Sequence, residues 1–162
     1  MKPTGIVRRT DDLGRVVIPR EIRKKLKIKE GDPLEIFVDR DGEVILKKYS
    51  PIVGLEDFAQ EYADSLHEIM EHTVIITDQD IIVAGAPKRN RFLGKSIPSF
   101  AEDVIRNKNN FILDNTVCVP IISIGDIIGT VTLFSENNKI VGELELKLAE
   151  TAALFLAKQL EI

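Results

Sequence analysis

The chain has 162 residues, of which 44% are hydrophobic and 30% are charged, a composition typical of folded globular proteins and not of disordered or fibrous ones. No apolar run reaches the about 18 residues that a membrane-spanning helix needs, and the first residues lack the apolar core of a secretory signal. We therefore expect a cytoplasmic protein without membrane contact. The only cysteine, Cys118, cannot form an internal disulfide, and its apolar neighbours Val117 and Val119 predict a buried thiol.

The net charge of −4 argues against a nucleic-acid partner only when the chain is taken as a whole. Residues 1–50 hold 13 Lys or Arg against 9 Asp or Glu, whereas residues 51–162 hold 9 against 17. This difference in sign predicts two domains with separate roles, one over residues 1–50 and one over residues 51–162.

Short elements separated by turn residues are predicted for the first fifty residues. The expected strands are residues 4–9, 15–18, 34–39 and 43–47. A helix should begin after Pro19, whose missing N–H costs nothing there, and should end before Gly31. Asp41-Gly42 supplies the positive φ that a hairpin turn between the last two strands requires.

A unit of this size has too few apolar side chains to offset the chain entropy lost on folding. We therefore expect the first domain to be an obligate homodimer. Two copies would pool their short strands in one sheet sandwich and cover the exposed strand edges.

Longer elements are predicted for residues 51–162. The expected helices are a long one after Pro51, one near residues 99–106 and a last one over residues 141–160. The expected strands are residues 73–77, 81–84, 116–122 and 127–134, with a turn at residues 78–80 and a loop at residues 87–91. Sheet residues bracketed by helices indicate an α+β domain.

The last helix has a broad apolar stripe with alanines beside it. The stripe consists of Val141, Leu144, Leu148, Thr151, Phe155 and Leu156, and the alanines are Ala149, Ala152, Ala153 and Ala157. Either the sheet of the same domain buries all of this surface, or part of it forms a contact between subunits, which is the interpretation we prefer.

The motifs Thr4-Gly5-Ile6-Val7-Arg8-Arg9, Asp12-Leu13-Gly14-Arg15-Val16-Val17-Ile18-Pro19 and Leu34-Glu35-Ile36 resemble the AbrB family of swapped-hairpin transition-state regulators. The rest of the chain resembles the GAF-like domain that follows such a domain in sporulation regulators of spore-forming Firmicutes. The resemblance implies an α+β protein in which a domain-swapped, DNA-binding dimer precedes a GAF-like domain that pairs into a homotetramer. It also implies an activator and repressor of late genes in the forespore.

Six basic residues match the positions at which the resemblance implies contact with double-stranded DNA. This basic surface consists of Arg8, Arg9, Arg15, Arg20, Arg23 and Lys24. The forked donors of a guanidinium bind phosphate or the O6/N7 edge of guanine bidentately. The alternative is an ordinary solvated charged face, because 9 acidic residues share the segment.

No residue pattern predicts catalysis, a metal site or a cofactor, so we expect a protein that is not an enzyme. Asp11 and Asp12 have no His or Cys neighbour, and a loop aspartate more often caps local backbone N–H groups than binds a metal. His67 and His72 have no evident catalytic partner. Gly125 and Gly129 are interpreted as a turn and a close-packed strand position.

Two questions stay open at the level of sequence. The GAF-like domain can enclose a small-molecule effector between its sheet and residues 91–106, or it can serve only to hold DNA-binding dimers in register. An antitoxin-type protein-binding module is the alternative for the first domain. The folded pattern of residues 51–162, which differs from a disordered toxin-binding tail, argues against it.

Overall fold

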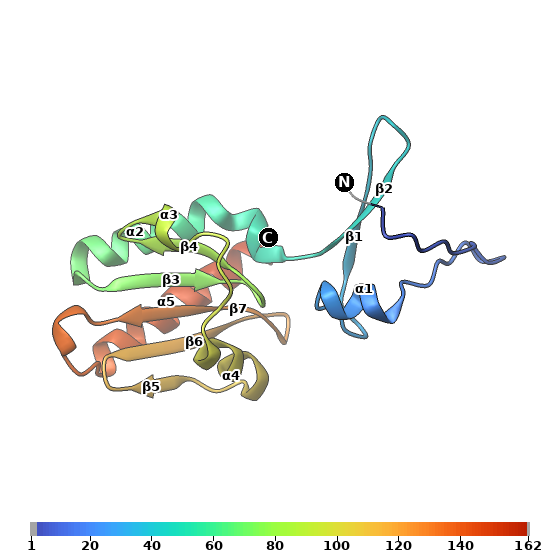
Figure 1. Cartoon of the computed structure of the whole chain (residues 1–162). Coiled ribbons are helices and arrows are strands. Elements are labelled where there is room, and N and C mark those ends of the chain that lie inside the picture. Colours follow the sequence, from blue (N-terminus) through green and yellow to red (C-terminus); the bar gives the residue numbers. More distant parts are fainter. Residues whose placement is uncertain (1–2, 162) are drawn as a thin grey trace. The chain divides into compact units, whose positions relative to one another are not determined.

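The computed structural model describes residues 3–161 and divides the chain into two compact units, the first ending at Tyr49 and the second beginning at Ser50 (Figure 1). We call them the N-terminal unit and the C-terminal unit, and each is described by itself.

The N-terminal unit has one short helix and one hairpin. Helix α1 spans Arg20–Lys25, and the strands β1 (Leu34–Val38) and β2 (Val44–Lys48) pair antiparallel. The hairpin turn closes with the N–H of Asp39 donating to the carbonyl of Glu43 over 3.1 Å, and Gly42 has a φ of +82°. The predicted hairpin and its glycine turn are therefore confirmed, and the helix begins after Pro19 as predicted. It ends at Lys25, earlier than the predicted stop at Gly31, because Lys27 has a φ of +54°, which a right-handed helix does not contain.

Residues 3–19 differ from the prediction, because they contain no strand. Their backbone finds no partner strand among the described residues, and a strand needs a neighbour to form its ladder. The strands predicted over residues 4–9 and 15–18 are thus wrong for the single chain. No residue from 3 to 49 is buried, and the side chains of Val7 and Val17 are 84% and 71% exposed.

The C-terminal unit is built on one antiparallel sheet of five strands in the order β4-β3-β7-β6-β5 (Figure 1). The strands are β3 (Thr73–Thr77), β4 (Ile82–Ala86), β5 (Phe111–Leu113), β6 (Thr116–Ser123) and β7 (Asp126–Phe134). The predicted hairpins β3–β4 and β6–β7 are both present, since their alternating apolar residues and turn residues are local signals.

Helices cover both faces of this sheet. The helical segments are η1 (Pro51–Leu55), α2 (Glu56–Met70), α3 (Arg89–Phe92), α4 (Ser99–Asn107), η2 (Glu136–Asn138) and α5 (Glu143–Leu160). Helices α2 and α5 share the main core with one face, to which Val119 and Val131 belong. Helix α4 packs on the opposite face, where Cys118 is buried with Ala101 and Val104. The α+β class is confirmed.

Two short elements were not predicted, and the first of them lies partly in the loop expected at residues 87–91. Helix α3 has 4 residues and β5 has 3, too few for a periodic pattern to reveal them. Gly129 is a close-packed position as predicted, because a Cβ built there would lie 1.9 Å from the carbonyl oxygen of Thr77. Gly125 has a φ of +85° and is the predicted turn residue.

Candidate nucleic-acid interface

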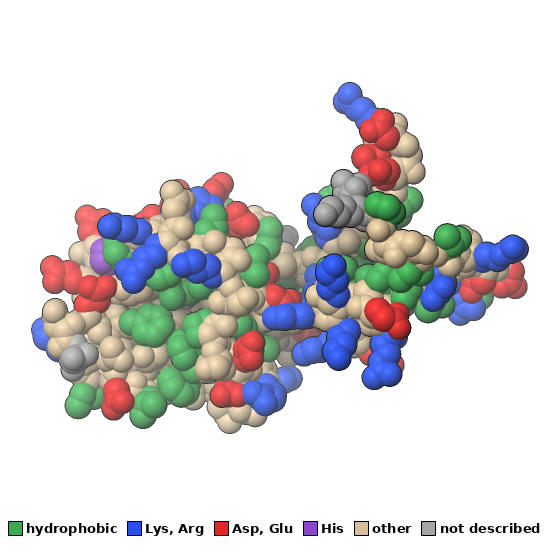
Figure 2. Space-filling view, in the orientation of Figure 1, with side chains coloured by type: hydrophobic (Ala, Val, Ile, Leu, Met, Phe, Trp, Pro, Cys, Tyr) green, Lys and Arg blue, Asp and Glu red, His purple; other side chains and the backbone are tan. Residues whose placement is uncertain are grey.

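All six residues of the basic surface are exposed and lie in the N-terminal unit. Arg8 and Arg9 belong to the extended segment 3–19, Arg15 closes the loop within it, and Arg20, Arg23 and Lys24 lie on α1. Lys and Arg side chains, drawn in blue in Figure 2, lie at the surface of this unit. Their charged groups are therefore accessible to a large anionic partner.

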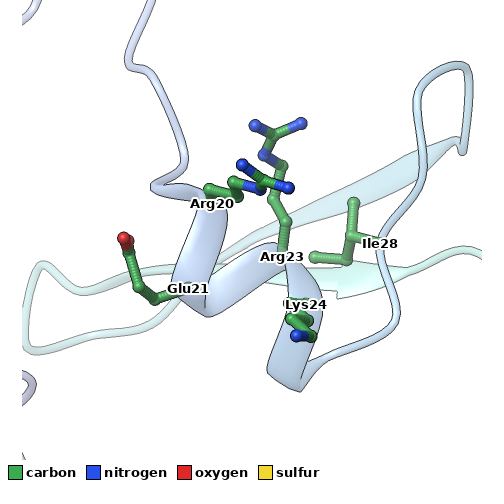
Figure 3. Close-up of a pocket in the computed structure, with 5 residues that line it drawn as sticks. All are labelled: Arg20, Glu21, Arg23, Lys24 and Ile28. Carbon is green, nitrogen blue, oxygen red and sulfur yellow. The ribbon is translucent and has the colours of Figure 1, made fainter.

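Helix α1 holds three of these cations in a defined arrangement. It starts after Pro19, whose carbonyl accepts the N–H of Arg23 at 3.0 Å. Arg20, Arg23 and Lys24 line an open hollow of about 480 Å³ together with Glu21 and Ile28. The guanidinium groups of Arg20 and Arg23 point to the same side of the helix, while Glu21 points away from them (Figure 3). This side can present two forked donors to one strand of phosphates.

Arg15 is held by the aspartate at the other end of its loop. Asp11 Oδ2 accepts a hydrogen bond from Arg15 Nε at 2.7 Å, and Asp11 Oδ1 accepts the N–H groups of Leu13 and Arg15 at 3.0 and 2.8 Å. These bonds, above all that from the Arg15 backbone N–H, hold the pKa of Asp11 below its ordinary value. The prediction that this aspartate caps local N–H groups is confirmed.

The sequence prediction missed the direct pairing of Asp11 with Arg15. The signal that could have found it is an acid four residues before an arginine, with Gly14 between them adopting a φ of +75°. A positive φ at this position lets the loop turn back so that its two ends meet.

The other five cations of the basic surface form no ion pair with any carboxylate in residues 3–161. Arg8 donates only to the carbonyl of its neighbour Val7, at 3.1 Å. Arg8, Arg9 and Arg15 do not line the hollow on α1. The single chain therefore leaves the charges free without gathering all six in one place, and that part of the expectation stays a prediction.

The space suggested for an effector in the C-terminal unit contains packed side chains. Between the sheet and α4, Ile97, Ala101, Val104 and Cys118 form an apolar cluster. The ring of Phe100 stacks on Phe111 with centroids 5.3 Å apart. Burial raises the pKa of the Cys118 thiol, so the predicted buried thiol is confirmed.

The two histidines lie in structural contacts. His67 Nδ1 is 2.8 Å from the carbonyl oxygen of His72, and His72 Nε2 is 3.4 Å from Glu145 Oε1. Among residues 3–161, no group of three or more His, Cys, Asp or Glu side chains could hold a metal ion. A search of the same residues finds no helix both long and apolar enough to cross a membrane.

The exposed basic unit and the helix-covered antiparallel sheet each have relatives among known proteins, the first in AbrB-type domains and the second in domains of GAF fold. Residues 7–53 match the family profile "Antidote-toxin recognition MazE, bacterial antitoxin". The transition state regulatory protein AbrB of Bacillus subtilis (strain 168) is 65% identical over 51 residues, which are 32% of this chain and 52% of AbrB. A solved GAF domain from an Acinetobacter phosphoenolpyruvate-protein phosphotransferase has 12% identity and a TM-score of 0.56, covering 68% of this chain and 86% of its own.

Residues 54–161 match the family profile described as "Stage V sporulation protein T C-terminal, transcription factor". Stage V sporulation protein T of Bacillus subtilis (strain 168) is 50% identical over an alignment of 179 positions, gaps included, which covers 99% of each chain. The chain belongs to the stage V sporulation protein T family and is a sporulation transcription regulator. Membership of this transcription-factor family agrees with the expectation that the protein is not an enzyme.

Proposed function

We propose that the N-terminal unit, as a homodimer, binds double-stranded DNA through Arg8, Arg9, Arg15, Arg20, Arg23 and Lys24. The observation that carries the proposal is that all six are exposed and five are unpaired within residues 3–161, in the one domain with a positive net charge. Unpaired surface cations attract the phosphate backbone and release its counterions.

The absence of any buried residue between positions 3 and 49 supports the dimer. Apolar side chains that are exposed in one chain include those of Leu13, Val38 and Val44, at 71%, 71% and 67%. Burying such side chains in a second copy would supply the core that this unit lacks, and the extended segment 3–19 would then find a partner strand.

Fluorescence anisotropy of labelled duplex DNA over a salt series tests DNA binding. If a dimer neutralises about six to ten phosphates, its affinity falls by about 10³ to 10⁵ between 50 and 200 mM salt. The triple variant Arg8→Ala, Arg15→Ala, Arg23→Ala is expected to bind weakly and with a flatter salt slope.

The matched control is Lys88→Ala, Arg91→Ala, Lys95→Ala, which removes three exposed cations from the C-terminal unit and should leave the slope unchanged. A folded wild-type protein that binds no DNA at low salt would overturn the proposal. Equal losses in the two triple variants would overturn the assignment of the site.

We further propose that the C-terminal unit joins two dimers into a homotetramer. Its last helix supports this, because Ala152 and Leu156 are buried while Leu144 and Leu154 are 62% and 57% exposed. The sheet of the same chain thus buries only part of the helix, and the rest is available to a second copy. Deleting residues 51–162 should weaken binding to duplexes with paired sites while single-site binding persists. Equal affinity of both proteins for paired sites would contradict the tetramer.

The resemblance supports action in the forespore cytoplasm, both as activator and as repressor, and a small-molecule effector for the GAF-like domain. A thermal-shift screen of the whole protein with nucleotides and metabolites tests the effector. A midpoint that no compound moves would favour a purely structural role for the domain.

An antitoxin function is the second candidate, and the match of residues 7–53 to the MazE profile favours it. Residues 50–161 fold into a sheet covered by helices, which differs from a disordered segment of the kind that wraps a toxin and argues against this candidate. Failure of the protein to bind DNA, together with capture of a purified toxin of the kind that MazE-type antitoxins recognise, would favour this candidate over the regulator.

A further inference from the structure

The loop of residues 11–15 is the most tightly bonded part of the segment before α1. Besides the three bonds to its carboxylate, Asp11 donates its N–H to the carbonyl of Arg15 at 3.0 Å and accepts the N–H of Gly14 at 3.1 Å. All these partners lie within five consecutive residues. These bonds therefore need no group from a second copy or from the C-terminal unit.

The direction of the contact determines which donors of Arg15 stay available. Asp11 engages Nε, and the structure gives the terminal Nη1 and Nη2 groups no partner among the described residues. The Arg15 side chain is 69% exposed, so its free end faces solvent. A guanidinium held at Nε presents its Nη groups end-on, which suits a pair of acceptors such as guanine O6 and N7 or two phosphate oxygens.

Stability alone does not explain the pair, because exposed ion pairs contribute little. Two backbone N–H groups also fix the carboxylate, so the loop already restricts the Arg15 side chain that would otherwise lose its conformational freedom on binding DNA. A preorganised contact loses less side-chain entropy when the complex forms.

We propose that Asp11 is a positioning residue that holds Arg15 for sequence-selective contact with DNA. The inference rests on the proposed function. The negative charge of Asp11 also weakens the non-specific attraction of Arg15 to phosphates, because the carboxylate lies beside the guanidinium. Asp11 thus lowers affinity for DNA in general and raises the preference for the right sequence.

Asp12 provides a matched control for this role. It carries the same charge at the adjacent position, and no hydrogen bond or ion pair joins it to another described residue. Asp11→Asn and Asp12→Asn therefore remove equal charge from the same loop, but only the first removes the acceptor of Arg15 Nε.

The test compares two duplexes of equal length, one enriched by the wild-type protein from a randomised library and one with its sequence shuffled. The readout is the selectivity ratio of the full-length protein, which is the dissociation constant for the shuffled duplex divided by that for the enriched duplex. Asp11→Asn is expected to lower this ratio about tenfold. Asp12→Asn should strengthen binding to both duplexes alike and leave the ratio unchanged.

A double-mutant cycle separates positioning from a general structural effect. In an Arg15→Ala background, Asp11→Asn should cause no further loss of the ratio, because the side chain that it positions is gone. The Arg15 Nε–H signal in NMR spectra should lose its protection from exchange in Asp11→Asn and keep it in Asp12→Asn.

Asp11→Glu keeps the charge but moves the carboxylate, and it replaces Asp11→Asn as the test variant if Asp11→Asn does not fold. The ratio for Asp11→Glu should fall, while its affinity for the shuffled duplex should stay unchanged. An unchanged ratio in these Asp11 variants, or an equal loss in the Arg15→Ala background, overturns the inference alone. A wild-type protein that binds neither duplex at low salt overturns the proposed function and the inference together.

Discussion

The two units of this chain obtain their order in different ways. In the C-terminal unit, Ile76, Val117 and Leu133 are fully buried between sheet and helices, whereas no residue from 3 to 49 is buried. The first arrangement is complete in a single chain, and the second has a hairpin, a short helix and local loops without a core. The comparison shows that one polypeptide can combine a domain that has its own core with a unit that has none, and the proposed dimer would supply what the second lacks.

The largest expected effect on stability comes from a substitution in the core of the C-terminal unit. Gly129→Ala places a Cβ 1.9 Å from the carbonyl oxygen of Thr77, so β3 and β7 must separate. We expect a loss of about 3 kcal/mol in the free energy of unfolding, measured by urea denaturation followed by circular dichroism.

Gly125→Ala is the control, because a Cβ there meets nothing and only the φ of +85° is strained. It should cost about 1 kcal/mol. Equal costs for the two changes would show that the packing between β3 and β7 is looser than the structure gives.

Dilution should affect only the unit without a core. Hydrogen exchange in β1 and β2 is expected to accelerate as the protein is diluted. A dimer that dissociates on opening loses about 0.7 kcal/mol of protection per protomer for each tenfold dilution, because the open fraction grows with the square root of the dilution. Exchange in β6 and β7 should stay slow. Mass spectrometry over a concentration series measures both exchange rates. Equal acceleration in the β1–β2 and β6–β7 hairpins would contradict the difference between the two units.

The smallest effect concerns acid stability of the C-terminal unit. The N–H of Gly142 donates to Glu145 Oε2 at 2.7 Å and, with a smaller contribution from His72, holds the pKa of Glu145 below its ordinary value. A carboxyl whose pKa is lowered by folding stabilises the protein at neutral pH, and this stabilisation is lost as the pH falls below about 4.5.

Glu145→Gln should therefore cost about 0.5–1 kcal/mol at pH 7 and almost nothing at pH 3. Glu143→Gln, a change at an exposed neighbour in the same first turn, should alter neither value. Thermal unfolding at both pH values checks this, and a loss for Glu145→Gln that persists at pH 3 would assign its role to packing instead of charge.

The same contrast explains how far the sequence predicted the structure. The strands at residues 73–77 and 116–122 appear at or near their predicted bounds because their alternation and turn residues are local signals, and their partners lie in the same chain. The strands predicted at residues 4–9 and 15–18 are absent because the described residues of the same chain offer them no partner strand. A periodic pattern predicts what can form a strand, not which chain supplies its neighbour.

Site prediction met a similar limit. Composition and resemblance selected the six basic residues, but only the geometry showed that Asp11 engages Arg15 through Nε and that Arg20 and Arg23 point to one side of α1. The direction of a side chain depends on loop closure, which here required a positive φ at Gly14.

The buried thiol of Cys118 is a built-in probe of local opening in the C-terminal unit. It is the only cysteine in the chain, it is fully covered by α4 and the sheet, and its raised pKa keeps it protonated and slow to react. A thiol reagent added to the native protein can modify it only during the moments when α4 lifts away. The rate of that modification would therefore report how often this face opens, without any label being introduced.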